Sequence, residues 1–79
     1  MITQKLVVQR INELCKEYGL NYYTLSYKAA IPKSTILNII HGTNPTKETI
    51  HKICGGFNIS IGTFFNREYF YEVYDDDNE

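Results

Sequence analysis

The sequence predicts an all-α protein that consists of one small domain with five short helices. Its length of 79 residues allows a single hydrophobic core and little more. Apolar residues recur at the three- and four-residue spacing of helices, and residues typical of caps and turns separate these stretches. A hydrophobic fraction of 43% and a charged fraction of 22% are typical of a globular domain and not of a disordered chain.

The first helix is predicted over residues 3–18, where an inner stripe of apolar residues has helical spacing: Val7, Ile11, Leu14 and Tyr18. Polar residues, Arg10 among them, are expected to cover the solvent side. Thr3 is the expected N-cap, and Gly19 is expected to end the helix in the left-handed conformation.

A second, shorter helix is predicted after the N-cap Asn21, with Leu25 and Ala29 directed inward. It ends at residue 29 or 30, and Ile31-Pro32 breaks it because the residue before a proline avoids the helical conformation. A helix this short needs tertiary packing to be stable.

A third helix is predicted to have Pro32 in its first turn, where the missing N–H of proline costs nothing. It runs to about His41 and is closed by Gly42. Ile36 and Ile39 form its expected inner face, so its other side chains point elsewhere.

The fourth helix is predicted to follow the N-cap Thr46 and has an inner face at helical spacing: Ile50, Ile53, Cys54 and Phe57. Gly55-Gly56 near its end costs about 2 kcal/mol relative to two alanines. Close packing of a neighbour or fraying of the helix explains the pair. Ser60 is the expected N-cap of a short fifth helix with three apolar residues: Ile61, Phe64 and Phe65.

Two oppositely charged regions make up the formal net charge of −1. Residues 1–67 hold eight basic and three acidic side chains, a net +5, whereas residues 68–79 hold six acidic side chains and no basic one, a net −6. This asymmetry hints at a polyanionic partner. We therefore expect a domain at 1–67 and a tail at 68–79. The aromatic part of the tail is strand or helix, packed on its own core or on a second copy, and the acidic end is solvated.

Several classes of function are not expected. Cys15 and Cys54 lie in a sequence without an export signal, so no disulfide is expected, and His51 with Cys54 alone makes a poor metal site. Ser34 and His41 lie about 10 Å apart along one helix, too far for a nucleophile and its base. No apolar run is long enough to span a membrane. We expect a cytoplasmic, non-enzymatic protein without a cofactor or a small-molecule substrate.

Residues 22–41 have the plan of a helix-turn-helix, in which two short helices flank a tight turn and the second exposes small polar and basic residues. Such a helix fits the major groove of DNA, where each base pair shows a distinct set of donors and acceptors. The alternative is an ordinary helical hairpin without a role in DNA binding.

A series of residues in register extends this pattern along residues 5–66: Gly19-Leu20-Asn21, Leu25, Ala29, Ile31-Pro32-Lys33-Ser34-Thr35-Ile36, Ile39, Gly42, Asn44-Pro45-Thr46, Thr49-Ile50, Lys52-Ile53, Ile59-Ser60 and Phe64-Phe65. Together they resemble the Cro/phage-repressor class of helix-turn-helix proteins, often called the Xre family. The resemblance implies a compact five-helix, lambda-repressor-like domain whose third helix enters the major groove. It also implies a homodimer on a near-palindromic operator in double-stranded DNA.

By this resemblance, Lys33, Ser34 and Asn38 of the third helix face base edges, and Leu37 shares that exposed side, where the family often has a small or polar residue. Lysine can donate to guanine, and asparagine can pair with adenine through two hydrogen bonds. Leu37 either meets a thymine methyl group or is an ordinary surface leucine.

Six further residues are candidate phosphate contacts, of which Thr35 contacts either phosphate or a base: Asn21, Tyr22, Thr35, His41, Thr43 and Asn44. Tyr22 stands where the family often has a glutamine. Its hydroxyl can still donate to phosphate, whereas a base contact made by that glutamine is not expected. For His41 the alternative is a solvent-facing helix end, where its positive form is favoured.

The sequence therefore predicts a sequence-specific, repressor-like transcriptional regulator. The alternative is a protein–protein interaction module or an antitoxin-like partner on the same fold, which the modest charge, Tyr22 and exposed Leu37 and Ile40 leave open. The acidic residues 75–79 are further expected to compete with DNA for the basic surface, so their deletion should raise the affinity for random duplex at low salt.

Overall fold

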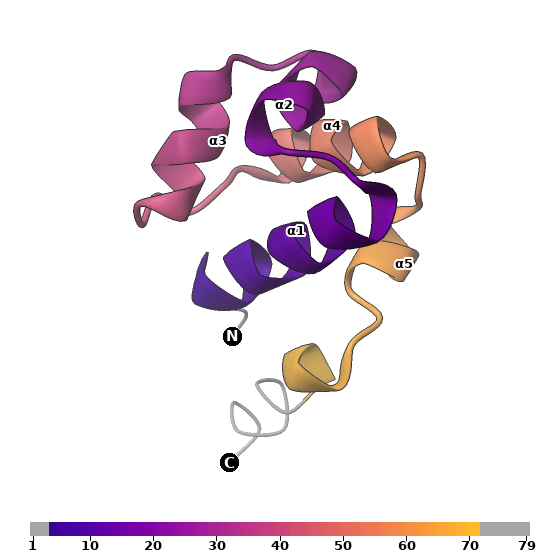
Figure 1. Ribbon diagram of the computed structural model, residues 1–79. Coiled ribbons are helices and arrows are strands. Elements are labelled where there is room, and N and C mark those ends of the chain that lie inside the picture. Colours follow the sequence, from indigo (N-terminus) through magenta and orange to yellow (C-terminus); the bar gives the residue numbers. More distant parts are fainter. Residues whose placement is uncertain (1–3, 72–79) are drawn as a thin grey trace.

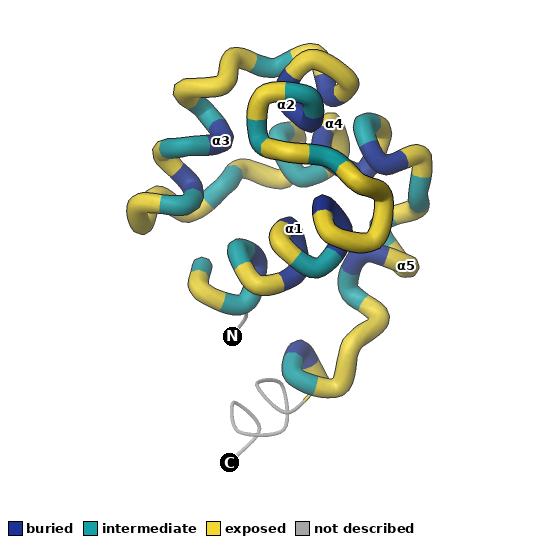
Figure 2. Tube along the Cα trace, viewed as in Figure 1, coloured by how far each residue is buried: buried dark blue, intermediate teal, exposed yellow. Residues whose placement is uncertain are grey.

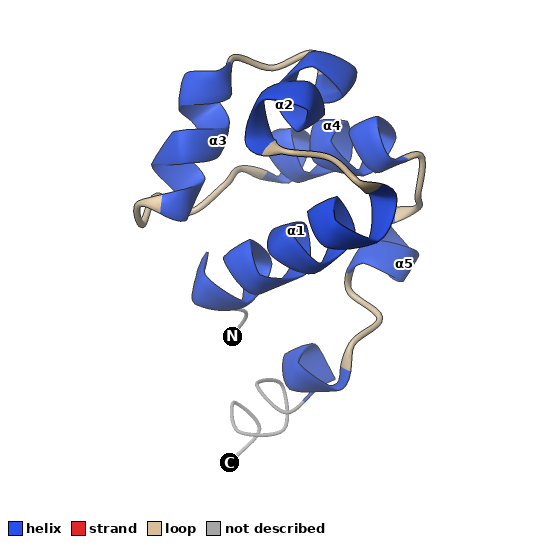
Figure 3. Ribbon diagram, in the orientation of Figure 1, coloured by secondary structure: helices blue, strands red, loops and turns tan. Residues whose placement is uncertain are grey.

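The computed structural model describes residues 4–71, and the regular elements in that range are all helices (Figure 1, Figure 3). Five helices follow one another: α1 (Gln4–Tyr18), α2 (Tyr22–Ala29), α3 (Lys33–Ile40), α4 (Lys47–Phe57) and α5 (Ile61–Phe64). A further helical turn occupies residues 68–71. The prediction of an all-α fold is confirmed. The predicted cap Thr3 and the predicted acidic end of the tail lie outside the described residues.

Helix α1 runs through the middle of the molecule (Figure 1). On one side of it α2 and α4 pack against each other, and α3 contacts both α2 and α1. Helix α5 follows α4, and the turn at 68–71 lies on the opposite side of α1 from α2 (Figure 1). This arrangement leaves α3 at the surface, remote from the C-terminal turn.

Side-chain caps begin three of the helices, as predicted. The Asn21 side chain accepts from the Thr24 N–H at 2.8 Å, and the Thr24 hydroxyl accepts from the Asn21 N–H at 2.9 Å, which is a reciprocal capping box. Thr46 and Ser60 cap α4 and α5 in the same way with one bond each. The prediction for Pro32 is wrong in detail. It has extended backbone (ψ 144°) and is the N-cap residue of α3, so this helix begins without a side-chain cap.

The core is one cluster to which every helix contributes (Figure 2). Its buried apolar residues come from the predicted inner faces, from the C-terminal turn and from Cys15, which was not predicted: Val7, Ile11, Leu14, Cys15, Leu25, Ile36, Ile39, Ile53, Cys54, Phe57, Phe64 and Phe70. Two expectations for α1 are wrong. Tyr18 is 46% exposed because α1 ends there and the chain turns away at Gly19 (φ 67°). Arg10, expected on the solvent side, is only 2% exposed.

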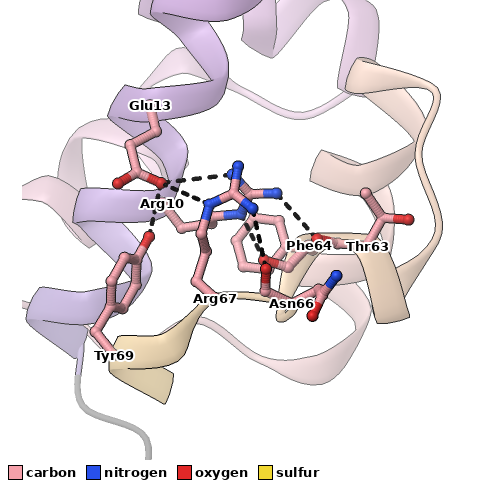
Figure 4. Close-up of polar contacts among 7 residues, drawn as sticks. All are labelled: Arg10, Glu13, Thr63, Phe64, Asn66, Arg67 and Tyr69. Carbon is pink, nitrogen blue, oxygen red and sulfur yellow. Dashed lines mark hydrogen bonds and ion pairs between the residues drawn. The ribbon is translucent and has the colours of Figure 1, made fainter. Parts of the chain in front are cut away.

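Arg10 is buried because its guanidinium is fully engaged (Figure 4). Its Nε and Nη2 donate to two backbone carbonyl oxygens of α5 at 2.6 and 2.9 Å, and its Nη1 lies 3.5 Å from Glu13 Oε1. The same carboxylate oxygen accepts from the Tyr69 hydroxyl at 2.8 Å and lies 3.5 Å from Arg67 Nε. This network joins α1 to the end of α5 and to the C-terminal turn.

Gly56 allows α2 and α4 to approach each other closely. A Cβ at Gly56 would lie 3.0 Å from the backbone nitrogen of Ala29 and 3.1 Å from its Cβ, tighter than ordinary van der Waals contact. A Cβ at Gly55 would meet nothing within 4 Å. Of the two explanations for the glycine pair, close packing therefore holds at Gly56.

The C-terminal turn packs on the core of its own chain. Residues 68–71 are helical, Phe70 is 1% exposed, and its ring lies 4.9 Å from that of Phe65 in an edge-on arrangement. Of the alternatives for the aromatic segment, the described part is thus a helix on its own core. Residues 72–79 lie outside the described range.

Candidate nucleic-acid interface

Three residues turn the chain from α2 into α3. Ala30 adopts the left-handed conformation (φ 57°), and the Ile31 N–H donates to the Ser26 carbonyl oxygen at 3.1 Å, which closes the end of α2. Pro32 follows with the fixed φ that proline imposes, here −62°. The left-handed conformation costs a non-glycine residue about 1 kcal/mol, so the packing of the two helices must hold Ala30 in it.

Helix α3 has one buried and one exposed side. Ile36 and Ile39 are almost completely buried and attach it to the core, as predicted. Residues of the other side include the four predicted base-reading candidates, of which the polar three are exposed and the leucine is half-buried: Lys33, Ser34, Asn38 and Leu37. The structure thus brings all four onto one short helix at the surface.

The exposed side of α3 offers hydrogen-bond donors and one apolar group. The helix contains Lys33 and no acidic residue, so its own charge is positive. Leu37 is not among the residues of the described range that pack against the core. An aliphatic group, an amide and an ammonium at one surface match the chemistry that base edges in the major groove present.

The candidate phosphate contacts fall into two groups. One group lines a shallow depression beside Asn38: Thr35, Thr43 and Asn44. His41 is the exposed C-cap residue of α3 and lines a different depression, which it shares with Gln4. The other group, Asn21 and Tyr22, lies at the start of α2 and lines neither of these two depressions.

Tyr22 and Asn21 are already engaged within the protein. The half-buried Tyr22 packs against the core, and its hydroxyl donates to Asn12 Oδ1 of α1. Because a phenol has one proton, Tyr22 can donate to phosphate only if it leaves Asn12. The Asn21 side chain caps α2, which leaves its amide nitrogen free to turn outward.

A family model decides what kind of domain this is. The model of the Cro/C1-type HTH DNA-binding domain matches residues 10–68, well over half of the chain. The chain belongs to this family. In this Cro/C1-type domain α2 and α3 are the two helices of the helix-turn-helix, and the resemblance found in the sequence is confirmed.

Two further comparisons, with curated proteins and with solved structures, found no match. Membership of the Cro/C1-type family makes DNA the expected class of partner and DNA-dependent regulation the general function. Within residues 4–71 no helix is both long and apolar enough to cross a membrane.

Three residues with a structural role were missed from the sequence. Arg10, Asn12 and Gln4 each bond a residue of another helix, namely of α5, α2 and α3. For Arg10 a signal did exist, because it stands three residues after Val7 and beside Ile11, at the edge of the inner stripe. For the other two no local pattern indicates the partner.

Proposed function

We propose that this Cro/C1-type domain is a sequence-specific transcriptional regulator of the repressor type that reads the major groove of double-stranded DNA with α3. One observation supports this most strongly. A helix-turn-helix of the DNA-binding family presents a second helix whose exposed side has Lys33, Ser34 and Asn38 and no acidic residue. Selectivity would come from that side and affinity mainly from neutralised phosphates.

The proposed roles follow from side-chain chemistry. Lys33 donates to guanine, Asn38 pairs with adenine, Ser34 bonds either kind of base, and Leu37 contacts a thymine methyl group. Residues within and next to the helix-turn-helix contact phosphates: Asn21, Tyr22, Thr35, His41, Thr43 and Asn44. Tyr22 would exchange its bond with Asn12 for one with phosphate.

We further propose a homodimer on a near-palindromic operator, because two copies related by a two-fold axis would place two α3 helices in successive major grooves. The division into a DNA-binding domain at 1–67 and a tail at 68–79 also stays a prediction. The burial of Phe70 shows that residues 68–71 share the core of that domain.

Selection of bound sites from a random duplex pool, followed by gel-shift titration at two salt concentrations, tests the proposal. We expect one enriched motif with two related halves and an affinity that falls as salt rises. Lys33→Ala should weaken binding to the selected site. Lys52→Ala is the matched control, because Lys52 lies on α4 and pairs with Glu48 at 4.0 Å. Absence of duplex binding at the lower salt concentration contradicts the proposal.

A second candidate function, a protein-binding module on the same fold, is favoured by exposed aromatic residues. Tyr23 and Tyr27 stand one helical turn apart on α2 and are 65% and 83% exposed. Tyrosine is enriched at protein interfaces. This function predicts no enriched motif in the selection and a tight complex with a protein partner that Tyr27→Ala weakens.

A further inference from the structure

The first residue of α1 contacts the last turn of α3. The Gln4 side-chain amide donates its Nε2–H to the backbone carbonyl oxygen of Ile39, which is 35 residues away in the sequence. The Gly42 N–H also donates to this oxygen, at 3.1 Å. The carbonyls in the last turn of a helix lack partners within the helix, so a donor from another element fixes that end. Figure 1 shows the start of α1 beside the end of α3.

Gln4 lies at the surface where the start of α1 meets the end of α3. It borders two surface depressions, one with Val8 and Ile40 in its wall and one with Pro45 and Phe65 in its wall. Four of the apolar side chains around it are only half-buried: Val8, Ile40, Pro45 and Phe65. A directional hydrogen bond is therefore positioned where close packing alone does not determine how α3 is tilted on α1.

Helix α3 has few restraints of its own. It is eight residues long, its N-cap Pro32 makes no side-chain cap bond, and its last turn contains no basic residue to bond its carbonyl oxygens. Ile36 and Ile39 attach it through one side. A helix this short depends on tertiary contacts for its stability and its orientation.

We propose that Gln4 is a positioning residue for DNA reading: its bond to Ile39 sets the orientation of α3 and hence the base-specific part of DNA affinity. This inference rests on the proposed function. It adds a residue outside the range matched by the family model, which begins at residue 10. Gln4 itself touches no base.

Orientation affects the two parts of DNA affinity differently. Hydrogen bonds to base edges need side chains held to within about 0.5 Å of the productive geometry. Attraction to phosphates comes from charge and tolerates such shifts. Loss of the Gln4 bond should therefore lower the affinity for the selected site and leave the affinity for random duplex unchanged.

The experiment compares Gln4→Met with Gln9→Met, both in the full chain. Methionine matches glutamine in length and charge but cannot donate a hydrogen bond, and Gln9 is an exposed residue on the same helix. For Gln4→Met we expect the ratio of specific to random affinity to fall about tenfold, the loss of one good base contact, with the salt dependence unchanged. Gln9→Met should keep the wild-type ratio. Equal loss on both duplexes, or no loss, overturns the proposal.

Hydrogen exchange without DNA supplies a second measurement. The Gly42 and Thr43 amides close the end of α3 by donating to Ile39 and Asn38. They should exchange faster in Gln4→Met than in Gln9→Met. If wild-type protein binds no duplex, the proposed function fails, and this exchange difference alone decides whether Gln4 orients α3. Equal exchange rates in the two variants overturn that role.

Discussion

Arg10 has the chemistry of a surface residue and the position of a core residue. Its guanidinium is accepted in the interior because the Thr63 and Phe64 carbonyl oxygens and the Glu13 carboxylate match its donors. Periodicity placed the apolar inner stripe correctly apart from Tyr18. It missed Arg10, because the two carbonyl oxygens that accept from its guanidinium lie more than fifty residues away along the chain.

We predict that Arg10→Met lowers the free energy of unfolding by about 3 kcal/mol, because two buried carbonyl oxygens lose their donor and Glu13 loses one of its partners. Arg67→Met is the control, since Arg67 also pairs with Glu13 but has a side chain that is 42% exposed. It should cost less than about 1 kcal/mol. Urea unfolding measures both, and equal losses would contradict a special role for Arg10.

The exposed side of α3 was predictable because helical spacing alone separates Ile36 and Ile39 from Asn38. We predict that Asn38→Ala weakens binding to the selected duplex by about 1–3 kcal/mol and relaxes preference at one base pair. Asn66→Ala, a substitution after α5, should change neither the affinity for the selected duplex nor the base preference. Gel-shift titration on single-base variants of the site measures the effect. A uniform loss over all sequences would show that Asn38 contacts the backbone of DNA instead.

The starts of the helices were the features easiest to predict, because the two partners of a capping hydrogen bond are close together in the sequence. The side chains of Asn21, Thr46 and Ser60 bond amides three residues ahead, so the pattern contains both partners. The approach of α2 to Gly56 has no such local signature, since Ala29 belongs to another helix. The sequence left two explanations open there, and only tertiary structure separates them.

Adjacent glycines of α4 should respond in opposite ways to the same substitution. Gly56→Ala places a Cβ against the backbone of Ala29, and we expect it to destabilise the protein by about 1–3 kcal/mol. Gly55→Ala meets open space and should stabilise the protein by up to about 1 kcal/mol through helix propensity. Thermal and urea unfolding of the two variants test this. Loss of stability in both would mean that α4 needs flexibility at its end.

At the scale of the whole molecule, the C-terminal turn at residues 68–71 holds α1 in addition to the contacts between α1 and α3. Phe70 inserts into the core and Tyr69 bonds Glu13, so the folded unit continues beyond the family match, which ends at residue 68. Composition placed the change of charge at residue 67 but could not locate this contact. An aromatic run of this kind is compatible with burial on its own core or on a partner.

The contact between Tyr69 of the C-terminal turn and Glu13 of α1 should weaken at alkaline pH. Burial, the bond to Glu13 and the charge of Glu13 raise the pKa of Tyr69 to about 12 from 10.0. The folded state therefore holds the phenol proton more tightly, so this contribution to stability is complete below pH 10 and is lost as the pH rises through about 12. The free energy of unfolding should fall less over this interval in Tyr69→Phe than in the wild type. Tyr27→Phe, on the surface of α2, should follow the wild-type curve.

The two buried thiols can serve as chemical probes of the opening of the core. Cys15 of α1 and Cys54 of α4 are both buried, and burial raises the pKa of each thiol, outweighing the opposing effect of Arg10 at Cys54. The thiols therefore stay protonated and shielded at neutral pH and react with an alkylating reagent only when the core opens. Mass spectrometry of pulse-labelled protein would time that opening separately at α1 and at α4. Simultaneous labelling would show that the two helices part in one cooperative event.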